Sequence, residues 1–380
     1  MVSRSRPHDD AAHALPTQAA GPAPVRTGEP FAIPVEEHAA LLEALARGVP
    51  EVEAEAGGLL RQMTRHVLAT PGKLLRPLLM LDACRAAGGD PQLAFPAAVG
   101  TEFGHLASLI HDDIIDGDHE RRGQPTVHVK YGIAPALLTG DLLLFHMFRC
   151  YVECRERGAD PGRVLDAIET LSTTCIDMCR GQALEAMLTG RLDTTEQEYL
   201  EMIGLKTAVA YRAAARIGAC LGGAPPEAIE AVGSYGYNVG LAFQIVDDLF
   251  TFEGQAAMVG KPLDSDLRNG RVTLPLIYAL QAGGPEAREQ LAAALGVRPA
   301  GADEGRPETG APNGAAWPGD NGAGYVQLVR LLEETGALAR ARARAARFTE
   351  EAKRQLDRLA PSEARERLRA LADSLLERQR

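Results

Sequence analysis

Acidic residues interrupt two apolar, helix-forming stretches of this chain, and any fold must give those charges a partner. The first stretch reads LIHDDIIDGDHERRGQPTVH and contains Asp112, Asp113 and Asp116. On a helix, residues four apart lie about 6 Å from each other on one face, so Asp112 and Asp116 can share a hard cation. Arg121 and Arg122 follow closely, and arginine suits phosphate oxygens. This combination predicts Mg²⁺ together with a bound polyanion.

A second acidic pair, Asp247 and Asp248, lies in the apolar sequence LAFQIVDDLF. A buried carboxylate is costly unless it is paired with a cation or bound to a metal. The simplest explanation of two such clusters is a pair of acidic walls that face each other across a cavity. We expect metal ions and a diphosphate between those walls.

Helix-forming residues dominate the chain after the first 34 residues, and glycine and proline divide it into helix-length segments. Strand-like alternation and fixed repeats are lacking, so the fold class is predicted to be all-α. Residues 1–34 are rich in Ala, Pro and Gly and are predicted to be a disordered leader. Residues 35–380 are predicted to form a single helical domain, with a flexible Gly/Pro-rich insertion at residues 296–324.

The composition excludes several classes of function. The net charge of −11 argues against nucleic-acid binding, which needs a basic surface. The start of the chain lacks the apolar core of a signal peptide, and no apolar run reaches the length of about 20 residues that a membrane span requires. The six cysteines lack a CxxC pair and are expected to be buried thiols. We therefore expect a cytoplasmic protein.

Several lysines and arginines occur in apolar surroundings. Lys73 and Arg76 lie in PGKLLRP, Lys206 in GLKTAVA and Lys261 in VGKPLDSDL. Taken singly, each is explained by a charged head in water above a stem packed on apolar surface. Together with two aspartate clusters, they are better explained as cations for two diphosphate groups.

These motifs follow one another in the order found in one family of enzymes. From about Leu59 to its C-terminus the chain resembles the trans-isoprenyl diphosphate synthases, or polyprenyl synthetases. The motifs that carry the resemblance are GKLLRP (72–77), HLASLIHDDIID (105–116), RRGQPTVH (121–128), GDLLL (140–144), GQALE (181–185), KT (206–207), FQIVDD (243–248) and GKPLDSDLRNGRVTLPLIYAL (260–280).

The resemblance implies an isoprenoid-synthase-type helical bundle around a central cavity. It also implies a Mg²⁺-dependent prenyltransferase that joins an allylic prenyl diphosphate to isopentenyl diphosphate, head to tail. Asp112, Asp116 and Asp247 would bind Mg²⁺, with Asp113 nearby. The residues implied to contact the allylic diphosphate are Arg121, Lys206, Thr207, Gln244 and Lys261, and those for isopentenyl diphosphate are Lys73, Arg76, His105 and Arg122.

The chain departs from the family pattern at several positions. Thr251 stands where the second motif normally has its third aspartate, Arg271 where lysine is common, and Glu185 where aspartate is common. Loss of a supporting ligand typically lowers metal affinity or activity by about 10–100-fold, so activity is expected to persist. Three alternatives remain open: a subunit of a hetero-oligomeric synthase, a terpene cyclase-like relative that ionises a prenyl diphosphate, and a non-enzymatic helical scaffold.

The resemblance also implies where product length is set. Ala107 and Ser108, just before Asp112, are both small and are expected to line a pocket for the growing prenyl tail. Short-chain members often block this pocket with aromatic residues, so a product of C20 or longer is expected, and replacing Ala107 with Phe should shorten it. Family members are usually homodimers. The hydrophobic product would be transferred to membrane enzymes.

Overall fold

The structure is a computed structural model that describes residues 34–48, 55–70, 72–252, 265–295 and 323–377. These residues are almost entirely helical, apart from an antiparallel pair of two-residue strands, β1 (Glu120–Arg121) and β2 (Gln124–Pro125). The predicted all-α class is therefore confirmed. The predicted leader and nearly all of the predicted insertion lie outside the described residues.

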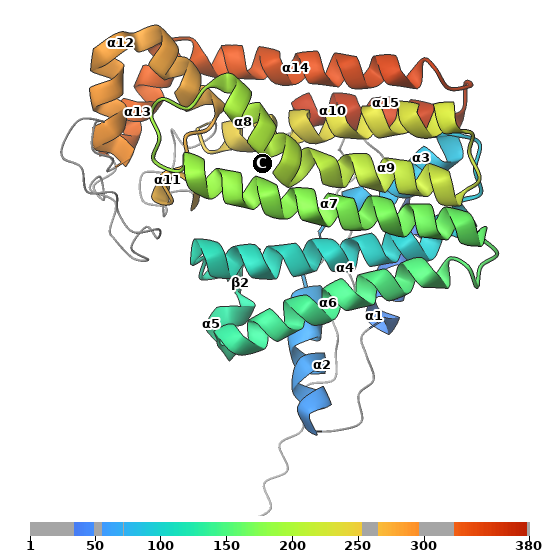
Figure 1. Cartoon of the computed structure of the whole chain (residues 1–380). Helices are drawn as coiled ribbons and strands as arrows, with labels where there is room; N and C mark the ends of the chain where they lie inside the picture. The colour runs from blue at the N-terminus through green and yellow to red at the C-terminus, as the bar shows by residue number, and fades with distance from the viewer. Residues whose placement is uncertain (1–33, 49–54, 71, 253–264, 296–322, 378–380) are drawn as a thin grey trace, which may run out of the picture.

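The helices are named in chain order in Figure 1. Their bounds are α1 (Val35–Arg47), α2 (Glu55–Leu68), α3 (Leu75–Ala86), α4 (Pro91–Asp116), α5 (Val127–Tyr131), α6 (Ile133–Glu153), α7 (Pro161–Leu188), α8 (Glu196–Ile203), the π-helix η1 (Gly204–Ala208), α9 (Val209–Leu221), α10 (Pro226–Phe250), α11 (Ser265–Arg268), α12 (Leu274–Leu295), α13 (Ala323–Glu334), α14 (Ala337–Leu356) and α15 (Glu363–Glu377).

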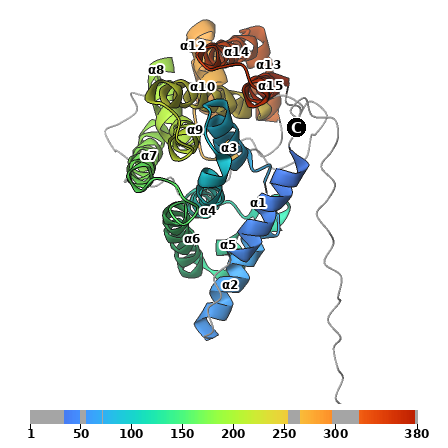
Figure 2. The same cartoon turned by 90° about the vertical axis from the view of Figure 1, so that its right-hand side faces the viewer.

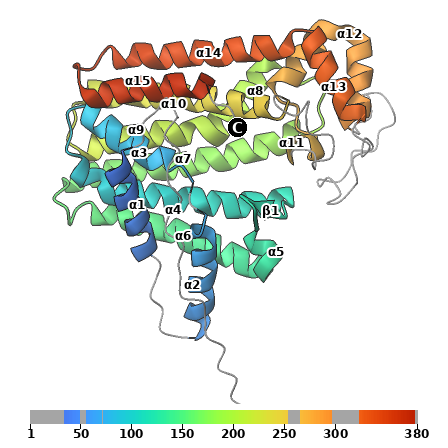
Figure 3. The ribbon, with the colours of Figure 1, turned by 180° about the vertical axis from the view of Figure 1, so that it is seen from behind.

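The long helices run side by side in stacked layers (Figure 1). Helix α4 packs against α6, α9 against α10, and α10 against α14. Seen along the bundle in Figure 2, α14 and α15 lie on one side and α6 on the opposite side. On the rear face, shown in Figure 3, α3 packs against both α9 and α15. Helix α7 contacts η1 and α9 and is drawn between α9 and α4 in Figure 1.

Local sequence explains where the two longest helices of the site begin and end. The Asp90 side chain accepts a hydrogen bond from Gln92 N at 2.9 Å at the start of α4, and Asp160 caps α7 in the same way. Each cap is followed by a proline, whose fixed φ suits the first helical turn. Gly117 ends α4 with φ of 65°, a conformation that costs glycine little.

Two of these helices are apolar enough, by length and composition, to cross a membrane. They are α4 and α6, and their most apolar windows are 61% and 33% buried within the bundle. Helix α4 is therefore a core helix of the bundle. Helix α6 has several apolar side chains that the described part of the chain leaves exposed.

Candidate active site

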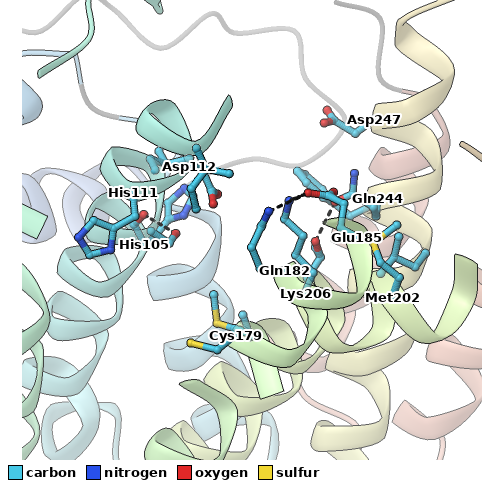
Figure 4. A pocket seen from close by; sticks show the side chains of 18 of the residues that line it. His105, His111, Asp112, Cys179, Gln182, Glu185, Met202, Lys206, Gln244 and Asp247 are labelled. Atoms are coloured by element: carbon cyan, nitrogen blue, oxygen red, sulfur yellow. Dashed lines mark hydrogen bonds and ion pairs between the residues drawn. The ribbon is translucent and has the colours of Figure 1, made fainter. Parts of the chain in front are cut away.

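A cavity of about 740 Å³ lies between α4 and the opposite wall formed by α7, η1 and α10. Figure 4 shows Asp112 on one wall and Asp247 on the other, with Glu185, Lys206 and Gln244 on the same side as Asp247. Asp116 lines the cavity as well. The carboxylates that the sequence placed in two clusters about 130 residues apart thus meet in one cavity.

Both acidic walls are C-terminal ends of helices. Asp112 and Asp116 lie at the end of α4, and Asp247 lies in the last turn of α10. The helix dipole puts negative potential at such an end, so carboxylates there repel the helix as well as one another. Burial raises the pKa of Asp112. The nearby Asp116 carboxylate raises that pKa further, while the Lys206 ammonium lowers it. This mouth of the cavity is therefore built to attract cations.

Lysine and arginine side chains lie between the carboxylates of this mouth. Lys206 Nζ lies 2.5 Å from Glu185 Oε2, and Arg271 Nη2 lies 2.5 Å from Asp116 Oδ1 and 3.1 Å from the same Glu185 oxygen. Arg271 Nη1 lies 2.8 Å from Asp266 Oδ1. Burial alone would lower the pKa of Arg271, but Glu185, Asp266 and Asp116 raise it above its usual range. These residues tie α4 to α7 and α11 across the mouth.

Asp113 faces away from this cavity, because consecutive residues on a helix point about 100° apart. It lines a separate pocket of about 50 Å³ and lies 2.6 Å from Arg121 Nε. Burial raises the pKa of Asp113 to about 6, and Arg121 acts in the opposite direction. Asp113 therefore holds Arg121 in place, and Arg121 reaches the main cavity.

The second aspartate of the α10 pair is fully engaged with neighbours. Asp248 accepts hydrogen bonds from Tyr199 Oη at 2.6 Å and Gln244 Nε2 at 2.9 Å, and Gln244 Oε1 accepts one from Thr207 at 2.8 Å. Burial and then Asp266 raise the pKa of Asp248 well above its usual range. Asp247, in contrast, is exposed to the cavity mouth. The two adjacent aspartates therefore have different environments: one fixes Gln244 and the other faces the solvent.

A basic corner of the cavity is formed by Arg76, His105, Arg121 and Arg122. The Arg76 guanidinium lies 4.7 Å from the Tyr211 ring centroid, and Arg122 Nη1 donates to Thr70 O at 2.8 Å. Burial lowers the pKa of His105 well below its usual range, and the three arginines lower it further. His105 is therefore a neutral hydrogen-bonding group in a positively charged corner, which is an environment that suits an anion.

Beyond the acidic mouth the cavity becomes a shaft with few charges. One face of α4 contributes Thr101, Gly104 and Ser108, spaced three and four residues apart. A Cβ on Gly104 would come within 2.3 Å of Met147 Sδ, so glycine lets α4 approach α6 closely here. Thr101 Oγ1 and Tyr151 Oη lie 2.9 Å apart. The remaining residues of this part of the wall include Leu144, Leu171, Thr174, Cys175 and Met178.

Lys206 and Thr207 are presented to the cavity by the π-helix η1 rather than by a regular α-helix. Such widened turns are rare and frequently occur at functional sites. Helix α7 lies against η1 at Gly181, where a Cβ would come within 2.4 Å of Lys206 N. The glycine of the GQALE motif thus brings Glu185 and Lys206 together.

Residues 58–306 match the family model described as Polyprenyl synthetase. This chain belongs to the polyprenyl synthetase family. The synthetase is 36% identical over 337 residues to the short chain isoprenyl diphosphate synthase of Methanothermobacter thermautotrophicus, covering 89% of this chain and 95% of that protein. It is also 36% identical to the geranylfarnesyl diphosphate synthase of Aeropyrum pernix, covering 82% of this chain and 92% of that protein.

Solved structures of related proteins have the same fold. The geranylgeranyl pyrophosphate synthetase of Pyrococcus horikoshii superposes with a TM-score of 0.78 at 30% identity, covering 91% of this chain and 97% of that one. The polyprenyl synthase of Caulobacter crescentus, complexed with calcium and isoprenyl diphosphate, gives 0.76 at 30% identity, covering 90% and 95%. The synthetase is therefore a prenyltransferase with the all-α isoprenoid synthase fold.

Most residues predicted for the site line the one cavity. These are Arg76, His105, Ser108, Asp112, Asp116, Arg121, Arg122, Lys206, Thr207, Gln244 and Asp247. Lys261 lies outside the described residues, and Lys73 is exposed and not part of the cavity wall.

Ala107 requires a correction. It is fully buried in the core and does not line the cavity, whereas its neighbour Ser108 does. The expectation that both residues face the prenyl tail is wrong for Ala107, because adjacent helical residues point in different directions.

Three residues of the synthetase site were not assigned a role from the sequence. Glu185 and Arg271 were noted only as departures from the family pattern, and the contacts of Arg271 with Asp116 and Glu185 required the fold. The role of Tyr199 could not be predicted from the sequence, because a tyrosine in an amphipathic helix is usually a core residue. Its bond to Asp248 joins residues 49 positions apart.

Proposed function

We propose that this synthetase condenses an allylic prenyl diphosphate with isopentenyl diphosphate, head to tail, to give a polyprenyl diphosphate of C20 or longer. The observation that carries the proposal is one cavity with an acidic mouth, a basic corner and a shaft with few charges. A charged headgroup with a long hydrocarbon tail fits that sequence of environments. Relatives named geranylgeranyl and geranylfarnesyl diphosphate synthases support the product length.

Mg²⁺ is the proposed cofactor, and the donor set fits it. Asp112, Asp116 and Asp247 offer hard carboxylate oxygens to a single cavity. Among the described residues, no three His, Cys, Asp or Glu side chains already stand together as a metal site. Mg²⁺ takes few protein ligands and completes its shell with substrate phosphate oxygens and water. When bound, Mg²⁺ would neutralise charge on the diphosphate leaving group.

The side chains of the cavity would stabilise the leaving group, position the second substrate and exclude water. Lys206 and Arg121 are placed to stabilise the negative charge that grows on the departing diphosphate, an interaction stronger in the transition state than in the ground state. Arg76, His105 and Arg122 would hold the second diphosphate so that its double bond faces the allylic carbon. The shaft would keep water from the carbocation. The released diphosphate can take the final proton, so no dedicated base is required.

The decisive experiment measures diphosphate release with Mg²⁺ and an allylic diphosphate, with and without isopentenyl diphosphate. Release only when both substrates are present supports condensation. Release from the allylic substrate alone would indicate a cyclase-like activity, and failure to bind either substrate would indicate a scaffold. Activity that appears only after a second type of subunit is added would indicate a hetero-oligomeric synthase.

We also propose that the synthetase is a homodimer. Leu138, Phe145 and Val152 recur every seven residues on α6 and are 61%, 73% and 44% exposed. Residues seven apart lie on one helix face, so these three apolar side chains share one side of α6. On α7, Leu165, Ile176 and Met187 recur every eleven residues and are also exposed. Exposed apolar residues gathered on helix faces are typical of contact sites, and a second copy of the chain is the proposed occupant.

A cytoplasmic location remains part of the proposal. All six cysteines are free thiols, which fits a reducing compartment. The substrates are proposed to be small prenyl diphosphates, and the long-chain product would pass to membrane enzymes.

A further inference from the structure

One guanidinium holds three carboxylates from three separate elements of the site. Arg271 contacts Asp116 at the end of α4, Glu185 on α7 and Asp266 on α11. All four side chains are largely buried, with exposed fractions from 11% for Glu185 to 25% for Asp266. Attraction between opposite charges is stronger in such a site than at an open surface. Arg271 is thus the cation around which these acids are arranged.

The contacts depend on the shape of arginine. The Nη1 group of Arg271 reaches Asp266 while Nη2 reaches both Asp116 and Glu185. A lysine ammonium is a single point charge and lacks the planar fork that spans two partners. The three-way contact therefore depends on arginine at position 271.

The bond to Asp116 has a consequence for metal loading. Asp116 Oδ1 is 2.5 Å from Arg271 Nη2, so one oxygen of the carboxylate that would bind a divalent ion is already paired with a cation. A metal ion that approaches alone must compete with the guanidinium for Asp116 and place a second positive charge beside it. A metal ion that arrives with a diphosphate brings phosphate oxygens, which suit the displaced arginine fork.

We propose that Arg271 is an internal counter-cation of the acidic mouth: it holds Asp116 until diphosphate arrives, and so makes divalent-metal binding dependent on diphosphate. This inference rests on the proposed function only through the role of Asp116 as a metal ligand. In this role Arg271 is a positioning residue. It acts on the metal site through Asp116 and Glu185.

The test titrates the purified full-length protein with Mn²⁺ and follows bound ion by electron paramagnetic resonance, with and without inorganic pyrophosphate. Wild-type protein is expected to bind Mn²⁺ weakly alone and tightly with pyrophosphate. Because Arg271→Gln removes the charge-assisted hydrogen bond to Asp116, the variant should bind Mn²⁺ alone about tenfold more tightly or better. Arg271→Lys, which keeps the charge, should fall in between.

Arg268→Gln is the matched control. Arg268 is three residues away, is 43% exposed and pairs with Asp118 rather than with Asp116, so its loss should leave Mn²⁺ binding unchanged. Arg271→Gln that binds Mn²⁺ alone no better than wild type would overturn the role of Arg271. If circular dichroism shows Arg271→Gln to be unfolded, Arg271→Lys decides, and unchanged affinity there overturns the proposal. Wild-type protein that binds no Mn²⁺ even with pyrophosphate would instead refute the proposed metal site.

Discussion

Ser108→Phe should shorten the product, and the structure supplies the scale. Ser108 and Thr101 lie four and eleven residues before Asp112 on the cavity-facing side of α4. At about 1.5 Å per residue, they are about 6 Å and about 16 Å below the acidic mouth. An extended isoprene unit has four main-chain bonds and spans about 5 Å. The wild-type shaft down to Thr101 therefore accepts about three units beyond the first, which corresponds to a C20 product.

A phenyl ring at position 108 would block the shaft one helical turn below Asp112, leaving room for about one further unit. The expected product is therefore shorter by about two isoprene units, with diphosphate chemistry retained. The assay incubates the enzyme with Mg²⁺, isopentenyl diphosphate and short allylic diphosphates, then sizes the dephosphorylated products by chromatography and mass spectrometry.

Ala107→Phe is the matched control for this reasoning. Ala107 is fully buried away from the cavity, so the added ring should overpack the core and cost about 1–3 kcal/mol of unfolding free energy without setting a new chain length. Ser108→Phe protein that makes wild-type products, or Ala107→Phe protein that is stable and makes short ones, would refute the assignment of the shaft.

Three further predictions concern stability and assembly. Tyr199→Phe leaves the buried Asp248 carboxyl with one donor fewer and should lower the unfolding free energy by about 1–3 kcal/mol in urea titrations; an unchanged midpoint would count against that hydrogen bond. Asp113 binds its proton more tightly when folded, because its pKa is raised to about 6. The contribution of Asp113 to the free energy of unfolding is therefore full below about pH 4 and is lost by about pH 6. The expected fall is about 3 kcal/mol, and Asp113→Asn should abolish it. Phe145→Glu should convert the proposed dimer to a monomer in light scattering, whereas Val326→Glu, at an exposed apolar residue of α13, should not; a dimeric Phe145→Glu protein would contradict the proposed interface.

Much of the site could be predicted because its chemistry is local in the sequence. Asp112 and Asp116 share a face through helical spacing alone, and an apolar run around them signals burial. The basic partners of these carboxylates could not be predicted in this way. Arg271 lies 155 residues from Asp116, and no periodicity relates them. Ala107 and Ser108 are equally small, and only the direction in which α4 presents its faces distinguishes them.

The amino-acid sequence was enough to predict that this protein is helical, that it carries two acidic clusters in apolar surroundings, and that it resembles a family of prenyl synthetases. These properties follow from propensity, spacing and motif order, which act over a few residues at a time. The folded arrangement was needed to see that Asp113 and Asp248 support their neighbours while Asp112 and Asp247 face the cavity, and that Arg271 contacts three carboxylates. Those outcomes depend on which helix ends meet, because the pairing of buried charges is set by packing between distant segments.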